Sequence, residues 1–75
     1  MYIRKFVEEL DEDTCTQIMK DMEQFEADGF IGNCTLRTVA GQVKDALGIS
    51  SITLCMLIVV NEVHRRYAYK YLSGE

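Results

Sequence analysis

The sequence predicts an all-α fold: a single compact domain of about four helices packed around a long, central C-terminal helix. Apolar residues recur with the 3.6-residue period of a helix in four segments. Glycines and short polar residues, which are typical of helix ends, separate these segments. A chain of 75 residues has room for one hydrophobic core. We therefore expect one domain over residues 1–75.

The first two helical segments lie in an acidic half, since residues 1–34 hold nine acids and three bases. One face of the first segment carries Tyr2, Ile3, Phe6, Val7 and Leu10. Asp11 is the expected N-cap of the second, whose apolar stripe is Cys15, Ile18, Met19, Met22 and Phe25. Whether the two helices are separate near residue 11 stays open. The solvated face of the second is expected to carry Asp21, Glu23, Glu26 and Asp28.

Gly29 suits the residue after the second helix, with Phe30 folding back on Phe25. Residues 29–34 read as a loop that Phe30 and Ile31 anchor to the core. Thr35 is the expected N-cap of the third helix, and Gly48 ends it. Gly41 lies in the middle of that helix, which suggests a close helix crossing. The buried stripe is predicted to be Leu36, Val39, Ala40, Val43, Ala46 and Leu47.

The fourth helix is predicted to begin after Ser50 or Ser51 and to run to about Leu72, a span of about 30 Å. Its apolar run over residues 54–60 is too short to cross a bilayer. The predicted core face carries Ile52, Met56, Val59, Val60, Val63, Tyr67 and Tyr71. The opposite face holds Leu54, Leu57, Ile58, Asn61, Arg65, Ala68, Tyr69 and Leu72.

Two interpretations of this second face stay open. The neighbouring helices enclose it, or it is a docking or dimerisation surface, as exposed apolar stripes with polar rims often are. The candidate partner-binding residues are Leu54, Leu57, Ile58, Asn61, Arg65, Tyr69 and Leu72. Bases and tyrosines alternate over residues 64–71, which fits a protein-binding hot spot, stacking on single-stranded nucleic acid, or simply cations at a helix C-terminus.

Composition argues against most other functions. The net charge of −4 disfavours nucleic acid and anionic membranes as partners. Cys15, Cys34, Cys55 and His64 could be counted as a Cys₃His set, but they lack the close spacing of zinc ligands. No secretory signal or catalytic motif is visible, so we expect a reduced cytoplasmic protein that is not an enzyme and has no cofactor or metal.

The strongest rival is DNA binding, because residues 43–57 look like a helix-turn-helix motif. Gly48 would lie at the turn, and Leu47, Ile49, Leu54 and Leu57 would take core positions. This segment departs from the motif at positions that are important for its turn and for contact with DNA. Lys44 replaces the usual alanine, and Ile52, Cys55 and Met56 would face the groove, where they cannot read bases.

The profile resembles the small, acidic, helical accessory proteins of tailed phages, which include anti-sigma factors, anti-CRISPR inhibitors and antiholins. Phe25-Glu26-Ala27-Asp28-Gly29-Phe30-Ile31-Gly32, followed by Thr35-Leu36-Arg37, is similar to the rapid-lysis antiholins of T-even phages. That resemblance implies binding to the soluble domain of a holin. The predicted function is a non-catalytic protein-binding module, an inhibitor acting by stoichiometric association. A DNA-binding regulator and a structural homodimer are the alternatives.

Overall fold

The computed structural model describes residues 2–29 and 32–72, with side chains up to Ala68. In this part of the chain there are four helices and no strand: α1 (Ile3–Glu8), α2 (Glu12–Asp28), α3 (Thr35–Leu47) and α4 (Ile52–Leu72). The predicted all-α fold is therefore confirmed. α1 and α2 are separate helices, which settles the question left open near residue 11.

The helix ends follow local sequence signals at most positions. Asp11 occupies the N-cap position of α2, as predicted, but its side chain makes no capping hydrogen bond. The Thr14 hydroxyl donates a hydrogen bond to the Asp11 carboxylate, which lowers the pKa of Asp11. Ser51 caps α4, because its Oγ accepts a hydrogen bond from the Leu54 N–H at 3.2 Å. Gly29 and Gly48 follow α2 and α3 with φ of +68°, a conformation that favours glycine.

The N-cap of α3 was predicted one residue too late. Cys34, not Thr35, is the cap, and its Sγ accepts from the Arg37 N–H at 3.4 Å. A thiol is a weak acceptor. The helix can begin there because a carboxylate from α2 provides a second cap, which is described below. The predicted contacts of Phe30 and Ile31 lie outside the described residues.

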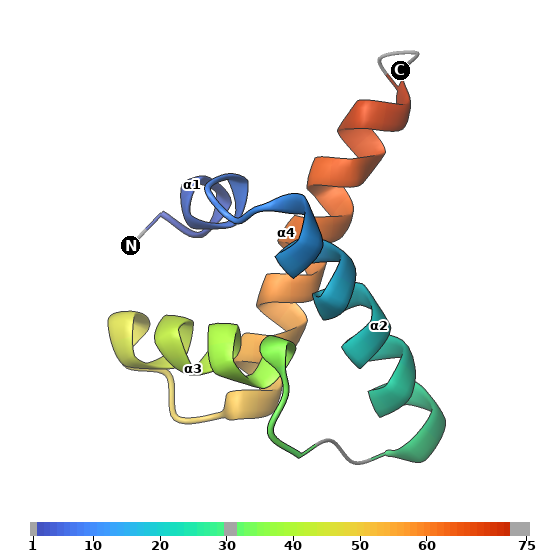
Figure 1. Ribbon diagram of the computed structural model, residues 1–75. Helices are drawn as coiled ribbons and strands as arrows, with labels where there is room; N and C mark the ends of the chain where they lie inside the picture. The colour runs from blue at the N-terminus through green and yellow to red at the C-terminus, as the bar shows by residue number, and fades with distance from the viewer. Residues whose placement is uncertain (1, 30–31, 73–75) are drawn as a thin grey trace.

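α4 packs against each of the other three helices, and α3 also packs against α2 (Figure 1). At 21 residues, α4 is the longest of the four helices, and its C-terminal turns extend past α1 and α2 (Figure 1). The buried core draws on all four helices. It consists of Val7, Cys15, Ile18, Met22, Leu36, Val39, Ala40, Val43, Cys55, Met56, Val59, Val60 and Val63.

Three residues predicted to be buried are instead exposed. Tyr2 precedes α1 and is 84% exposed. Ala46 and Leu47 lie in the last turn of α3, which extends away from α2 and α4 (Figure 1). Because α3 crosses α4 at a steep angle of 107°, only its first three turns reach the core. The apolar stripe of α3 therefore continues past the part of the helix that α2 and α4 cover.

Gly41 is not at a close helix crossing, contrary to the prediction. A Cβ atom built at Gly41 would have no neighbouring atom within 4 Å. The glycine therefore lowers the stability of α3 without a packing reason visible among the described residues.

We accordingly expect Gly41→Ala to raise the free energy of unfolding by about 0.5–1 kcal/mol. The gain arises because alanine loses less backbone entropy on folding than glycine does. Urea unfolding followed by circular dichroism measures it. Gly48→Ala is the matched control, and it should be destabilising because Gly48 has a φ of +68°. An unchanged or lower stability of Gly41→Ala would show that space at this position is tighter than the structure indicates.

Candidate protein-binding surface

The outer face of α4, defined by the candidate residues Leu54, Leu57, Ile58, Asn61 and Arg65, is largely uncovered. Leu54 and Leu57 are each 47% exposed, Asn61 and Arg65 are exposed, and Ile58 is half-buried. The neighbouring helices therefore do not enclose this face at its two leucines. The remaining candidates, Tyr69 and Leu72, have side chains outside the described part of the chain.

Charged residues border the outer face on the side of α1. The Glu62 carboxylate lies 3.9 Å from the Arg4 guanidinium and 4.0 Å from that of Arg65. Both arginine side chains are more than half exposed, so each pair contributes little to stability, about 0–1 kcal/mol. Their arrangement gives the exposed leucines a polar rim, which is the usual anatomy of a protein-binding surface.

Arg66, beside Arg65 in sequence, has a different role. Its Nη1 donates to the Leu10 carbonyl at 2.7 Å, to the Val7 carbonyl at 3.1 Å and to the Cys15 Sγ at 3.3 Å. These contacts tie α4 to the end of α1 and the beginning of α2. The two arginines of the mixed basic and aromatic segment therefore differ. Arg65 lies on the surface, whereas Arg66 joins α4 to α1 and α2, a difference that the sequence pattern does not reveal.

The cysteines are buried or partly buried. Burial raises the pKa of the Cys15 thiol, and the positive charge of Arg66 only partly opposes that effect. The thiol is therefore protonated at neutral pH and a poor nucleophile. Cys55 is buried and Cys34 is half-buried. No group of three metal-ligating side chains gathers within the described residues.

Asp21 is not part of a solvated face, contrary to the prediction; it is 9% exposed. Its Oδ2 accepts from the Leu36 N–H at 3.0 Å, and its Oδ1 accepts from the Gln17 Nε2 at 2.9 Å. The carboxylate of α2 therefore caps the N-terminus of α3. The other three carboxylates, Glu23, Glu26 and Asp28, are exposed as predicted.

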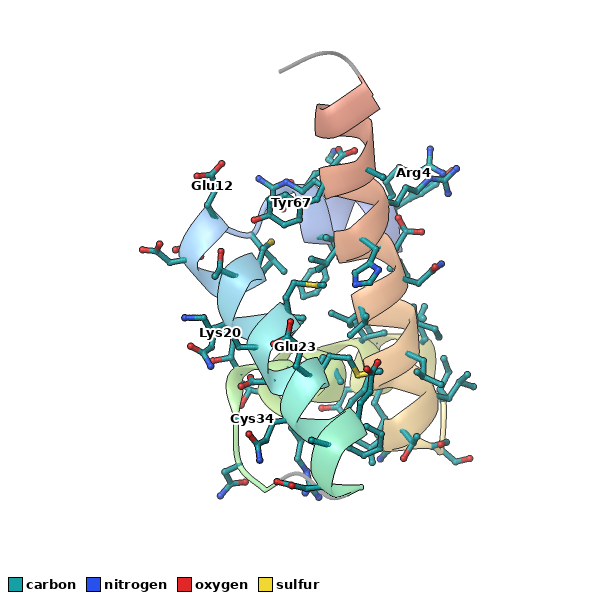
Figure 2. The ribbon with its side chains drawn as sticks, turned by 90° about the vertical axis from the view of Figure 1, so that its right-hand side faces the viewer. Arg4, Glu12, Lys20, Glu23, Cys34 and Tyr67 are labelled. Atoms are coloured by element: carbon teal, nitrogen blue, oxygen red, sulfur yellow. The ribbon has the colours of Figure 1, made fainter. Side chains whose placement is uncertain are left out.

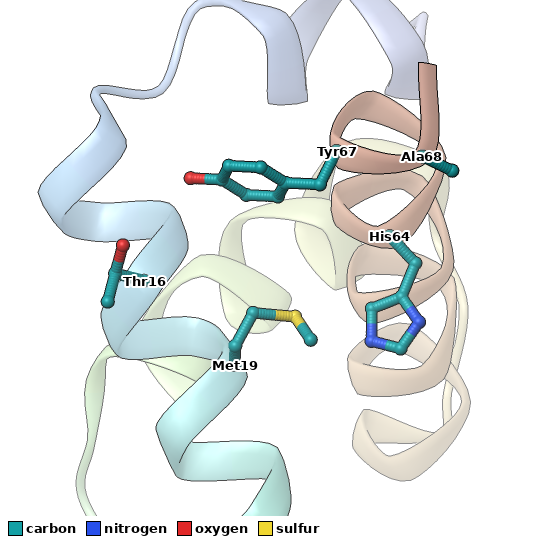
Figure 3. Close-up of a pocket in the computed structure, with 5 residues that line it drawn as sticks. All are labelled: Thr16, Met19, His64, Tyr67 and Ala68. Carbon is teal, nitrogen blue, oxygen red and sulfur yellow. The ribbon is translucent and has the colours of Figure 1, made fainter. Parts of the chain in front are cut away.

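A groove that the sequence analysis did not predict lies between α2 and α4. Thr16 and Met19 line it from α2, and His64, Tyr67 and Ala68 line it from α4 (Figure 3). Tyr67 extends from α4 toward α2, and Figure 2 places it among the side chains between the two helices. The groove has a volume of about 480 Å³, is open to solvent and is mostly apolar.

α3 and α4 share one feature with a helix-turn-helix motif. They cross at 107°, and residues 48–51 connect them, which is the usual geometry of that motif. Three of the four predicted core positions are wrong, because Leu47, Leu54 and Leu57 are exposed, whereas Ile49 packs against the core as predicted. Cys55 and Met56, which were expected to face the DNA groove, are instead buried in the core. Within the described residues, no single helix is long and apolar enough to cross a membrane. Residues 35–47 and 52–68 together reach the length and hydropathy of a membrane span, but they form a pair bent by 107°.

No protein-family model, curated protein or solved structure matches this chain.

Proposed function

We propose that this protein is a non-catalytic binding module that associates with another protein through the outer face of α4, with α4 as the central helix of the fold. The observation that carries the proposal is the exposure of Leu54 and Leu57, each 47% exposed one turn apart on the same helix. Exposing large apolar side chains to water is unfavourable by about 25 cal/mol per Å². Covering them with a partner recovers that free energy.

The surroundings of the two leucines support the same function. Asn61 and Arg65 continue the face toward the C-terminus, and the Arg4–Glu62–Arg65 cluster borders it. Polar groups at the edge of an apolar patch set orientation and reject wrong partners more than they add affinity. The resemblance to phage antiholins suggests a hypothesis about the identity of the partner. The partner would be a holin, and binding would inhibit that holin.

Leu57→Asp should weaken complex formation about tenfold or more without unfolding the chain, because a desolvated charge replaces an apolar contact at the centre of the face. The measurement is affinity capture from the native host with quantitative mass spectrometry, followed by titration of the captured protein. Circular dichroism of each variant checks the fold.

Asn33→Asp is the control, since it adds the same charge at an exposed polar position outside α4. Equal capture by the native chain and the Leu57→Asp variant would refute the proposal. Light scattering of the pure native chain identifies the alternative of self-association: a dimer that Leu57→Asp converts to a monomer would make the partner a second copy.

A second candidate function, duplex DNA binding, is favoured by the 107° crossing of α3 and α4. It predicts duplex binding that weakens steeply with salt and is lost on changing Ser51 or Arg65. The exposed residues at the start of α4 include Leu54 and Leu57, which offer no hydrogen-bond donors to bases. Fluorescence polarisation with a random-sequence duplex at low and high salt separates this function from protein binding.

A further inference from the structure

The outer face of α4 carries an excess of positive charge toward its C-terminal end. The guanidinium groups of Arg4 and Arg65 both lie near the Glu62 carboxylate, at 3.9 and 4.0 Å. The two arginine side chains are 58% and 56% exposed, whereas that of Glu62 is 16% exposed. One carboxylate is therefore shared by two guanidinium groups, and it is the least accessible of the three charges.

The neighbouring charges do not cancel this excess. Glu8 and Arg66 are the other charged residues that line the small cavity between α1 and α4. With them, the lining holds three arginines and two glutamates, a net charge of +1. Residues 46–61, which include both exposed leucines, hold no charged residue. A partner that covers Leu54 and Leu57 therefore meets its first charges on this face at the Arg4–Glu62–Arg65 cluster.

An open hollow of about 370 Å³ adjoins the Arg65 side chain, and its lining suits a carboxylate. Asn61, His64, Arg65 and Ala68 line it, and no acidic residue belongs to the described lining. The first three side chains each have an N–H group that can donate a hydrogen bond. The 4.0 Å contact between Arg65 and Glu62 is longer than a hydrogen bond. An ionised carboxylate only accepts hydrogen bonds, so its chemistry matches these donors.

From these observations we infer that the outer face of α4 binds an amphipathic helix of another protein, with the apolar ridge of that helix on Leu54 and Leu57 and an aspartate or glutamate side chain at Arg65. The inference rests on the proposed function and specifies the chemistry of the partner. Laying an amphipathic helix along an apolar surface is a recurring mode of recognition. Leu54 and Arg65 are about 16 Å apart along α4, so the carboxylate lies about three turns from the first apolar contact.

A second copy of this chain does not fit the charges of this face. A parallel pair of α4 helices would place Arg65 against Arg65, which is repulsive. An antiparallel pair centred on Leu57 would place Arg65 beside the beginning of the partner's α4. Residues 46–61 contain no acid that could meet it there. A different protein with acidic residues next to its apolar ridge supplies the missing charge.

The experiment uses a synthetic helical peptide of about 18 residues, long enough to form a helix in isolation. Leucines at the i, i+3, i+4 and i+7 positions form its ridge, and glutamates occupy the turn at each end, so that either orientation can reach Arg65. A second peptide is identical except that lysines replace the glutamates. Binding is followed by the NMR shift of the Leu57 methyl groups, with the Met19 methyl as a reference in the α2–α4 groove and buried Val43 as a reference in the core.

The glutamate peptide should shift Leu57 and bind about fivefold or more tightly than the lysine peptide. The net charge of −4 alone would favour the lysine peptide, so a preference for glutamate identifies the local cluster. That preference should shrink as the salt concentration rises, because salt screens exposed charges.

Charge reversal at one position provides the decisive variant. Arg65→Glu should weaken the glutamate peptide about tenfold and strengthen the lysine peptide, because attraction and repulsion exchange places. Lys20→Glu is the matched control: it makes the same change in net charge at an exposed position of α2, on the side turned away from α4 (Figure 2). It should leave the preference for glutamate unaltered. Leu57→Asp should weaken both peptides, and circular dichroism checks the fold of each variant.

The outcomes separate this inference from the proposed function. Equal binding of the two peptides, or tighter binding of the lysine peptide, would overturn the inference; if Leu57→Asp still abolished binding, the proposed function would stand. A glutamate peptide that leaves Leu57 unshifted or shifts Met19 instead would also overturn it, and capture from the host with Leu57→Asp would then decide the proposed function separately.

Two other occupants would be recognised by the same measurements, and each would overturn the inference. A native dimer in light scattering that Leu57→Asp dissociates, and that the glutamate peptide does not displace, would assign the face to a second copy. Duplex DNA binding that is lost in Arg65→Glu, without binding of the glutamate peptide, would assign Arg65 to a phosphate.

Discussion

Asp21→Ala should lower the free energy of unfolding by about 3 kcal/mol, a large part of the roughly 5–10 kcal/mol expected for a domain of this size. The Asp21 carboxylate accepts the Leu36 N–H at 3.0 Å in a buried position. Removing it leaves a buried N–H without an acceptor at the positive end of the α3 dipole. The cap that remains is the weakly accepting thiol of Cys34.

Urea unfolding measures this loss, and the midpoint temperature of thermal unfolding should fall by roughly 10–20 °C. Hydrogen exchange at the Leu36 amide gives a local readout, which should accelerate beyond the rest of α3. Glu23→Ala is the matched control: it removes an exposed carboxylate from the same helix and should cost less than about 0.5 kcal/mol. Asp21→Asn, which keeps one acceptor oxygen, should fall between the two. Equal stabilities of Asp21→Ala and Glu23→Ala would show that the carboxylate does not cap α3.

Arg66→Met should lower the free energy of unfolding by about 2 kcal/mol and loosen α1 in particular. The guanidinium donates to the Val7 and Leu10 carbonyls, which lie at and just beyond the end of α1. Hydrogen bonds from a charged donor contribute about 1.5–3 kcal/mol to stability. Removing the donor also leaves the two carbonyl acceptors unpaired, which is unfavourable. Methionine retains the apolar stem of the side chain, so the variant tests the guanidinium itself.

Arg65→Met is a particularly close control, because it makes the same substitution one residue earlier. The Arg65 side chain is 56% exposed and lies 4.0 Å from Glu62, so its loss should change stability by less than about 0.5 kcal/mol. Urea unfolding compares the two variants, and amide exchange in α1 should accelerate only in Arg66→Met. Similar stability of both variants, with α1 still protected, would contradict the role assigned to Arg66.

The two arginines show how far sequence patterns reach at the candidate site. The helical period of residues 52–72 separates a core face from an outer face, and the structure exposes Leu54 and Leu57 of that outer face. The period alone left open whether neighbours cover this face, because coverage depends on where the other helices lie. It also could not show that Arg66 turns inward, since the Val7 and Leu10 carbonyls are more than 50 residues away along the chain.

Helix number and helix ends were determined by the sequence itself. Apolar periodicity, the glycines at 29 and 48, the N-cap position of Asp11 and the cap at Ser51 involve only a few neighbouring residues, so they can be predicted without knowledge of the fold. The exception is the beginning of α3. It shifts from the expected Thr35 to a Cys34 cap because Asp21 reaches the Leu36 N–H from another helix.

Tertiary structure alone decided which parts of each helix are covered and what lies between helices. The steep crossing of α3 and α4 leaves Ala46 and Leu47 outside the core and leaves Gly41 without a close neighbour. The groove between α2 and α4 likewise joins residues about 50 positions apart. Local patterns determine which face of a helix is apolar, but the packing of one helix against another is set by contacts between distant segments, and these determine which apolar surface remains available for binding.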